Sequence, residues 1–374
     1  FRGDWQYRDV SVCLEHQHAL VALWEDKNIF ARIDIRARLP AIMDDVRAGK
    51  YDHPLLTVSD YDQWLDKRLC GNADNTDLRQ KSTQSITTLS GLLGQALLSM
   101  EEATSGNTVR RVQAVGFAAL VGYPDTTREA LDRLVGAVAA NHDRPTRALR
   151  KMYIRLAREH VKDAEFDWFR DLLTDRMAKW LPVGEGDVLL GKPNKKRLVH
   201  SVRSAADHTG IRPYTIELHL VEAGIIDADD PRPHRLKLFD ANAHAEFLEE
   251  IQNLVGYTQM RDILGATQSE LKAILADGLL TPFVNDTRIK KRWRRQECVD
   301  LVSRFSTDDP INVNVDDPHW ERLLAARKRT GLALRTLIDA IDDCRLPTGR
   351  AAGEDGFHSV LVPKAEVDEV YEKL

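Results

Sequence analysis

The sequence predicts a mainly α-helical protein in which a helical bundle precedes a tandem array of helix-turn-helix units. Three observations support this fold class. From Tyr61 onward, apolar residues return at intervals of three and four, which is the period of a helix with one buried face. Residues 182–197 then concentrate Gly, Pro and Lys, a composition that interrupts helices and marks a boundary. Beyond that boundary, one pattern recurs around Gly210, Gly265 and Gly331.

Length and composition set the outer limits. A chain of 374 residues allows two or three domains, each with its own core. Hydrophobic residues make up 43% of the chain, charged residues 30%, and the formal net charge is -5, so we expect a globular protein. Four widely separated cysteines form no disulfide framework and favour the reducing cytoplasm. The most apolar run, residues 112–123, is too short for a membrane-spanning helix, and we expect no secretory signal.

Residues 1–54 are expected to form a small, irregular, zinc-finger-like unit. Cys13 and His16 are separated by two residues, a gap that lets one tight turn present both side chains to Zn²⁺. A structural zinc site needs further ligands, and the spare candidates are His18 and the distant Cys70. The sequence therefore predicts half of a zinc site. The alternative is a buried, unliganded cysteine beside surface histidines.

Residues 55–190 are expected to form the helical bundle. Leu89, Leu92 and Leu93 continue the period of three and four. Further helices are predicted over residues 126–140 and from Pro145 onward, because a Thr start signal opens the first and a proline at the first position opens the second.

Three helix-turn-helix units are predicted over residues 191–254, 255–308 and 309–374. Six residues after each turn glycine stands an apolar anchor, and another apolar residue follows three or four positions later, as one face of a helix requires. An extended wing and a further helix follow in each unit. The anchors are Ile216, Leu271 and Leu337. The second helices end near Gly224, Gly278 and Cys344, and at the two glycines a left-handed stop is expected.

A helix-turn-helix unit binds DNA because its second helix stands clear of the body and fits a major groove. The alternative for each unit is a packing module or a protein docking surface. In the first unit, a basic segment precedes the motif, and the second helix and the wing add polar and basic groups, which together predict a groove-reading surface. Its candidate residues are Lys195, Lys196, Arg197, Arg203, Arg212, Tyr214, Thr215, His219, Arg235 and Lys237.

The second unit has the most basic wing. Its second helix offers Gln268, Ser269 and Lys272, polar groups able to reach base edges. Its wing gathers cations that attract phosphates around Trp293, whose ring either stacks on a strand or lies in the core. The wing cations are Arg288, Lys290, Lys291, Arg292, Arg294 and Arg295.

The third unit differs in charge. Asp339, Asp342 and Asp343 follow one another along its second helix. Because carboxylates repel phosphate groups, we expect this unit to bind protein or simply to pack against its neighbours.

Nothing in the sequence indicates catalysis. It contains no glycine-rich phosphate loop, no nucleophile elbow and no HExxH helix. Pairs of acidic residues, such as Asp229 with Asp230 and Asp316 with Asp317, stand beside prolines and are typical of turns and helix caps. We therefore expect a protein that is not an enzyme.

In their order along the chain, these features resemble the TniQ/TnsD family. The resemblance begins with the segment DWQYRDVSVCLEHQHALV, continues with SDYDQWLDKRL and the helical middle, and ends with the helix-turn-helix units, so it covers essentially the whole chain. It implies that Cys13 and His16 are one zinc-ligand pair of the family. The CxxC pair that the family places earlier does not occur among residues 1–12, and no CxG pair follows Trp24.

The resemblance also implies a function. Members select the insertion site of bacterial transposons by reading a DNA attachment site or by binding a CRISPR guide-RNA complex, often as dimers, and they recruit an AAA+ regulator and the transposase. We accordingly expect a cytoplasmic, nucleoid-associated adaptor with no membrane partner. The alternative is a helix-turn-helix transcription regulator, although a regulator normally needs only one such unit per chain.

Overall fold

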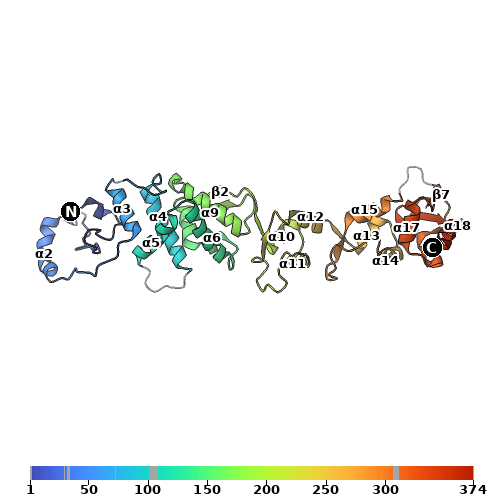
Figure 1. Ribbon diagram of the computed structural model, residues 1–374, viewed down its shortest axis with the longest axis horizontal. Helices are drawn as coiled ribbons and strands as arrows, with labels where there is room; N and C mark the ends of the chain where they lie inside the picture. The colour runs from blue at the N-terminus through green and yellow to red at the C-terminus, as the bar shows by residue number, and fades with distance from the viewer. Residues whose placement is uncertain are drawn as a thin grey trace. The chain divides into compact units, whose positions relative to one another are not determined.

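The computed structural model describes residues 2–28, 30–31, 34–71, 73–100, 108–305 and 311–373. The chain divides into two compact units, Phe1–Val199 and His200–Leu374. Both consist mainly of helices with short strands, which confirms the mainly α-helical prediction (Figure 1).

The first unit begins irregularly, as predicted. The short 3-10 helix η1 (Gly3–Gln6) and an isolated bridge between Val12 and Ala19 precede α2 (Ile35–Arg47). α2 has no buried residue, and Pro40 lies inside it. This region therefore adds little to the core of the unit.

The bundle follows and holds the core of the first unit. Tyr61, Trp64 and Phe117 pack together as aromatic rings, with centroids 5.0 to 6.0 Å apart. Leucines at three- and four-residue spacing complete this core, so the predicted period describes the buried faces correctly. The helices are α3 (Asp60–Leu69), α4 (Thr83–Leu98), α5 (Val109–Leu120), α6 (Asp125–Ala139), α7 (Pro145–Ala148), α8 (Arg150–Arg158), η2 (Ala164–Phe166) and α9 (Asp167–Trp180).

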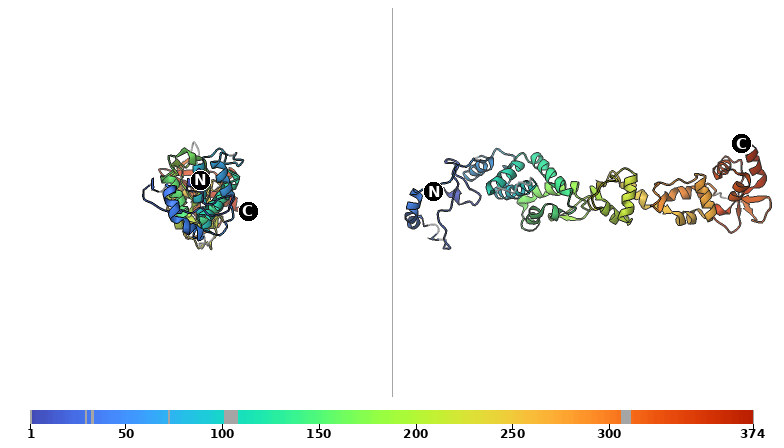
Figure 2. Two further views of the ribbon diagram at one scale, coloured as in Figure 1. Left: turned by 90° about the vertical axis from the view of Figure 1, so that its left-hand side faces the viewer. Right: turned by 90° about the horizontal axis from the view of Figure 1, so that it is seen from below.

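Two glycines let α4 and α5 lie unusually close, side by side (Figures 1 and 2). A Cβ atom on Gly94 would stand 1.8 Å from the carbonyl oxygen of Val112, and one on Gly116 would stand 1.8 Å from that of Ser90. Real side chains never approach a backbone oxygen that closely, so only glycine permits this helix pair.

The boundary between the units lies later than predicted. Residues 182–197 do interrupt the helices, but they form an antiparallel hairpin of β1 (Val188–Leu189) and β2 (Lys192–Pro193). Leu189 and Leu190 are buried in the core of the bundle. Because these two leucines bind the hairpin to the bundle, the units divide between Val199 and His200 instead of at residue 190.

The second unit contains three copies of one order of helices and strands. In each of three repeats an eight-residue helix ends at a glycine with positive φ, a second helix follows, and a later strand pairs with the strand that precedes the first helix. Repeat 1 consists of β3 (Val199–Ser201), α10 (Val202–Thr209), α11 (Pro213–Glu222), β4 (Leu238–Asp240) and α12 (Ala245–Gln252). Repeat 2 consists of β5 (Leu254–Gly256), α13 (Tyr257–Leu264), α14 (Gln268–Ala276), β6 (Lys291–Arg294) and α15 (Arg295–Ser303).

Repeat 3 has a larger sheet than the other two. Its strands follow the order β7-β9-β10-β8, with β7 parallel to β9 and the remaining pairs antiparallel. Its core is continuous with that of repeat 2. The elements are β7 (Ile311–Val313), β8 (Trp320–Arg322), α16 (Leu323–Thr330), α17 (Leu334–Asp342), β9 (Gly349–Ala351), η3 (Phe357–Ser359), β10 (Val360–Pro363) and α18 (Lys364–Glu372).

The turns explain why the repeat can be recognised in the sequence. Gly210, Gly265 and Gly331 have φ values of 71°, 56° and 79°, which are left-handed angles that glycine adopts without steric cost. The predicted left-handed stops are also confirmed, since Gly224 and Gly278 both have φ of 68°. The equivalent Cys344 adopts φ of 56° as well, although it carries a side chain.

Replacing Cys344 by glycine is expected to stabilise the protein by about 1 kcal/mol, because a residue with a side chain pays roughly 1–2 kcal/mol in the left-handed conformation. Cys344 is exposed, so little packing is lost. Comparing urea unfolding midpoints of Cys344→Gly and Cys344→Ala measures the effect, because alanine retains the steric cost. Equal midpoints would show that Cys344 is unstrained.

Candidate nucleic-acid interface

The predicted zinc pair is brought together by a tight turn. The Cys13 N–H donates to the carbonyl oxygen of His18 at 2.9 Å, and the Cys13 Sγ lies 3.4 Å from the His16 Nδ1. Two ligands of one tetrahedral zinc ion stand roughly 3.5 Å apart, so this spacing fits half a site. Cys13 is buried. Among the described residues, no third ligand joins the pair, and the spare candidate Cys70 belongs to a different cluster.

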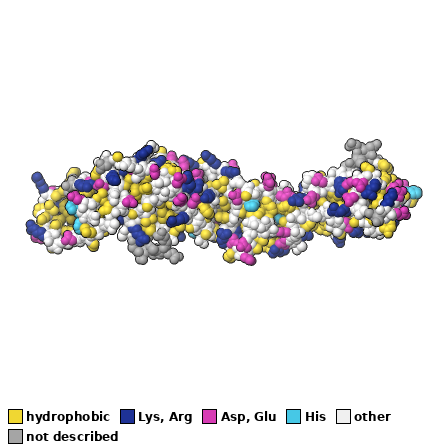
Figure 3. Space-filling model, viewed as in Figure 1, with side chains coloured by type: hydrophobic (Ala, Val, Ile, Leu, Met, Phe, Trp, Pro, Cys, Tyr) yellow, Lys and Arg dark blue, Asp and Glu magenta, His cyan; other side chains and the backbone are white. Residues whose placement is uncertain are grey.

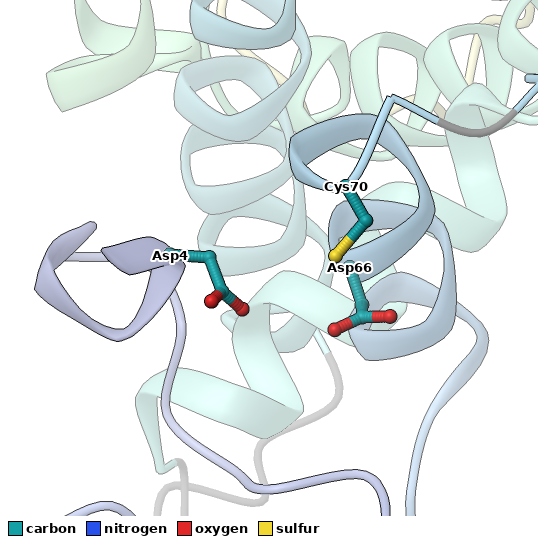
Figure 4. Close-up of side chains that lie close together, drawn as sticks. All are labelled: Asp4, Asp66 and Cys70. Carbon is teal, nitrogen blue, oxygen red and sulfur yellow. The ribbon is translucent and has the colours of Figure 1, made fainter. Parts of the chain in front are cut away.

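That different cluster consists of Asp4, Asp66 and Cys70, which converge from η1 and α3 (Figure 4). The Arg2 guanidinium fills the space between them. It donates to Asp4 at 2.7 Å and to Asp66, and it lies 3.4 Å from the Cys70 Sγ. Its hydrogen bond also lowers the pKa of the Asp4 carboxyl. A metal ion could bind here only after Arg2 moved away. We therefore interpret the cluster as ion pairs of Arg2 with Asp4 and Asp66 that join the N-terminal segment to α3.

In repeat 1, a loop from repeat 2 covers the middle of α11. Leu218 packs against Val284 and Ile289. The Glu222 carboxylate accepts hydrogen bonds from the backbone N–H groups of Asn285 and Asp286. This covering loop, residues 283–289, therefore makes the middle of α11 a packing surface.

Two residues predicted to be exposed in repeat 1 are buried, so these predictions are wrong. His219 is 2% exposed beneath the covering loop, and its burial lowers the pKa of the imidazole. Lys237 is 6% exposed, and its ammonium group donates to the Glu217 carboxylate. Although burial acts in the opposite direction, hydrogen bonds from Lys237 and His234 hold the pKa of Glu217 below its usual range. Lys237 therefore forms an internal ion pair with Glu217.

The other repeat 1 candidates are scattered over two units. Arg203 pairs with Asp207, and Tyr214 accepts a hydrogen bond from Arg288 of the second wing at 3.4 Å. Arg212 and Arg235 are exposed, and Thr215 is half-buried. The basic segment that precedes the motif lies in the first unit, where Arg197 donates to the carbonyl oxygen of Pro182. Its remaining members, Lys195 and Lys196, are exposed.

In repeat 2, the second helix, α14, has exposed polar side chains, and hydrogen bonds hold its first turn. The Thr267 hydroxyl accepts from the Glu270 N–H at 3.3 Å, and the Glu270 carboxylate accepts from the Thr267 N–H at 2.8 Å, which forms a capping box. The same buried carboxylate contacts His358 Nδ1 of repeat 3 at 2.8 Å. α14 also has three exposed side chains that form no hydrogen bond or ion pair within the described parts of the chain. They are Gln268, Ser269 and Lys272.

The wing of repeat 2 holds two kinds of cation. Arg288 pairs with Asp286, and Arg294 pairs with Glu250 and Glu297 at 2.8 and 3.1 Å. Arg292 is half-buried and donates to the carbonyl oxygen of Asn285. The other three cations are exposed and form no ion pair with any described residue. These three, here called the free wing cations, are Lys290, Lys291 and Arg295.

Trp293 lies in the core. It is 5% exposed, and the Arg292 guanidinium covers its ring at 4.6 Å. The interpretation of Trp293 as a core residue is therefore confirmed. The alternative interpretation, in which the Trp293 ring stacks on a nucleic-acid base, is wrong because the Arg292 guanidinium already covers the ring.

Repeat 3 carries the acidic second helix that the sequence predicts. Asp339 and Asp342 both interact with Arg304, and Asp343 pairs with Arg345 at 2.9 Å. The helix starts where the Leu334 N–H donates to Asp277 at the end of α14. α17 is thus held against repeat 2.

Charge is local in the second unit. On the face shown in Figure 3, Lys and Arg side chains are interspersed with Asp and Glu. On a surface of this kind, a polyanion would be attracted by small groups of unpaired cations, and the free wing cations are one such group. No described helix combines the length and the apolar character needed to cross a membrane. Comparison with family models, curated proteins and solved structures gives no match.

Proposed function

We propose that this protein binds duplex DNA through repeat 2, as a target-selection adaptor of the TniQ/TnsD type and not as an enzyme. The observation that carries the proposal is the pairing of an open, polar α14 with the free wing cations. In this proposal the repeats act as winged helix-turn-helix units, and α14 enters the major groove.

Comparison of the three repeats supports assigning the DNA contact to repeat 2. α11 of repeat 1 is covered along its middle, and α17 of repeat 3 is acidic. α14 offers amide, hydroxyl and ammonium groups, which are the groups that read base edges. The wing cations would hold the phosphates on either side, so that affinity comes from the wing and specificity from α14.

The remaining parts of the proposal rest on the family resemblance. Repeats 1 and 3 and the bundle would contact an AAA+ regulator, the transposase or a CRISPR guide-RNA complex, in the cytoplasm and near the nucleoid, with a homodimer as the acting form. Cys13 and His16 would supply two ligands of a zinc ion.

Titration of the full chain into a fluorescently labelled duplex across a salt series tests the proposal. We expect binding whose affinity falls as salt rises, because neutralised phosphates release counterions. The variant carrying Gln268→Ala and Lys272→Ala is expected to lose about 30-fold or more in affinity for a preferred site and little for random DNA, since base contacts contribute about 1–3 kcal/mol each. Failure of the wild type to bind any duplex at moderate salt would contradict the proposal.

A further inference from the structure

The bundle contains a cavity of about 530 Å³ between α4, α6 and α8. Its inner wall is apolar, because Leu92, Leu134 and Met152 line it and are buried. None of the described residues that line it is Phe, Tyr or Trp. Binding pockets in proteins have volumes of about 300 to 1,000 Å³, so this cavity is large enough to receive an apolar side chain of another molecule.

Two consecutive cations lie at the edge of this cavity. Arg150 and Lys151 line it, are exposed, and form no ion pair with any described residue. Arg150 also has a φ of 40°, where the chain passes from α7 into α8. This is a left-handed angle that a side chain disfavours, and residues strained in this way cluster at binding and catalytic sites. The cavity therefore combines an apolar interior with a positively charged edge.

The positive charge continues beyond the cavity along α7 and α8. Residues 142–159 hold six Lys and Arg side chains and only two carboxylates, in a chain whose net charge is -5. The last of these cations follows Arg150 by eight residues, which is about 12 Å along a helix. The charged surface is therefore longer than a small ligand. Its exposed members outside the cavity, none of which has an ion-pair partner among the described residues, are Arg144, Arg147 and Arg158.

The exposed face of α8 also carries an apolar side chain. Ile154 is 43% exposed and lies on the same face as Arg150, four residues earlier. Met152 and Leu156 are buried on the opposite face. An apolar centre surrounded by charged groups is the usual arrangement of a surface that binds another protein, in which a side chain of the partner fills a pocket.

We propose that this surface of the bundle binds a short acidic segment of a protein partner. A large apolar side chain of that segment would occupy the cavity, and its carboxylates would contact Arg150 and Lys151, because clusters of arginine recognise acidic motifs. A nucleic acid fits the surface less well, since unpaired bases bind by stacking on aromatic rings, which the cavity lacks among its described residues. The inference rests on the proposed function and deepens it, because it gives the chemistry of the protein partner that the bundle would contact.

The test begins with random peptides displayed on phage and selected on the full-length protein. We expect the enriched peptides to carry Asp or Glu beside one large apolar residue. Labelled copies of these peptides are then titrated with variants. Ala137→Phe places a ring in the cavity from an exposed position of α6 and is expected to weaken binding roughly 30-fold or more, as the loss of a buried anchor does. Arg150→Gln with Lys151→Gln is expected to weaken it about tenfold, as the loss of hydrogen bonds to charged groups does.

The controls keep each change and move it elsewhere in the first unit. Ala118→Phe adds the same ring at an exposed position of α5, and Lys67→Gln with Lys162→Gln removes the same charge from exposed sites. Both are expected to bind the peptides as the wild type does. Gln95→Trp fills the cavity from an exposed position of α4 and repeats the measurement if circular dichroism shows that Ala137→Phe does not fold.

Three results would overturn the inference. In the first, the wild type enriches no peptide that the cavity-filled variant does not enrich equally. In the second, the enriched peptides lack carboxylates or bind the double glutamine variant as tightly as the wild type. In the third, that variant loses as much affinity for a duplex as for the peptides, which would assign the cations to a nucleic acid. A wild type that binds no duplex fails the proposed function, and the peptide selection still decides whether this surface binds an acidic segment.

Discussion

Gly116→Ala is expected to be the most disruptive single substitution in the first unit. Its added methyl group would stand 1.8 Å from the Ser90 carbonyl oxygen, and only separation of α4 from α5 relieves such a contact. Overpacking a core costs roughly 1–3 kcal/mol and occasionally more. A clash with rigid backbone belongs at the upper end, so we expect a loss of about 3 kcal/mol or more. Gly94→Ala, the reciprocal change, should cost a similar amount.

The matched control is Gly91→Ala in the same helix α4. A Cβ atom at position 91 meets nothing within 4 Å, so the better helix propensity of alanine should leave stability unchanged or raise it by up to about 1 kcal/mol. Urea unfolding followed by circular dichroism measures all three variants. Similar midpoints for Gly91→Ala and Gly116→Ala would show that α4 and α5 do not make the close contact described.

Neutralising the three free wing cations is expected to produce the largest change in nucleic-acid binding. In the variant Lys290→Gln, Lys291→Gln, Arg295→Gln, the slope of log affinity against log salt should fall by about 2, because each lost phosphate contact contributes about 0.9. This count lets Lys290 and Lys291 share one phosphate and gives Arg295 a second. Affinity at moderate salt should drop roughly 100-fold, since each contact is worth about a factor of ten under those conditions.

The control for this prediction removes three positive charges elsewhere. Lys67, Arg133 and Lys162 are exposed residues of the first unit without ion-pair partners among the described residues. Their replacement by glutamine changes the net charge equally but should change the salt slope little. If both triple variants lose affinity to the same extent, binding depends on overall charge and the wing has no special role.

Much of the fold could be predicted from the sequence because its signals are local. Turn glycines such as Gly265 and helix-ending glycines such as Gly278 mark where the two helices of each repeat end. The leucine spacing indicates which faces of the bundle helices are buried. The strands before each first helix could not be predicted. They are three residues long, too short to show an alternating pattern, and they exist only because a later strand pairs with them.

The parts of the site that sequence reasoning missed depend on contacts between distant residues. Nothing near His219 indicates that residues 283–289 fold over it, and nothing near Lys237 indicates its pairing with Glu217. The same holds for the wing, where the sequence does not show which cations pair with acidic residues, as Arg294 does with Glu250 and Glu297.

Site-specific cross-linking to DNA tests the central claim most directly. A photoreactive residue is placed at Tyr214, Ser269 or Arg335, which occupy equivalent exposed positions in α11, α14 and α17, four residues after Gly210, Gly265 and Gly331. Each full-length variant is irradiated with the same labelled duplex. The account predicts strong cross-linking from position 269, with much weaker signals from 214 and 335. Equal signals from all three positions, or a signal confined to 214 or 335, would contradict the assignment of the DNA contact to repeat 2.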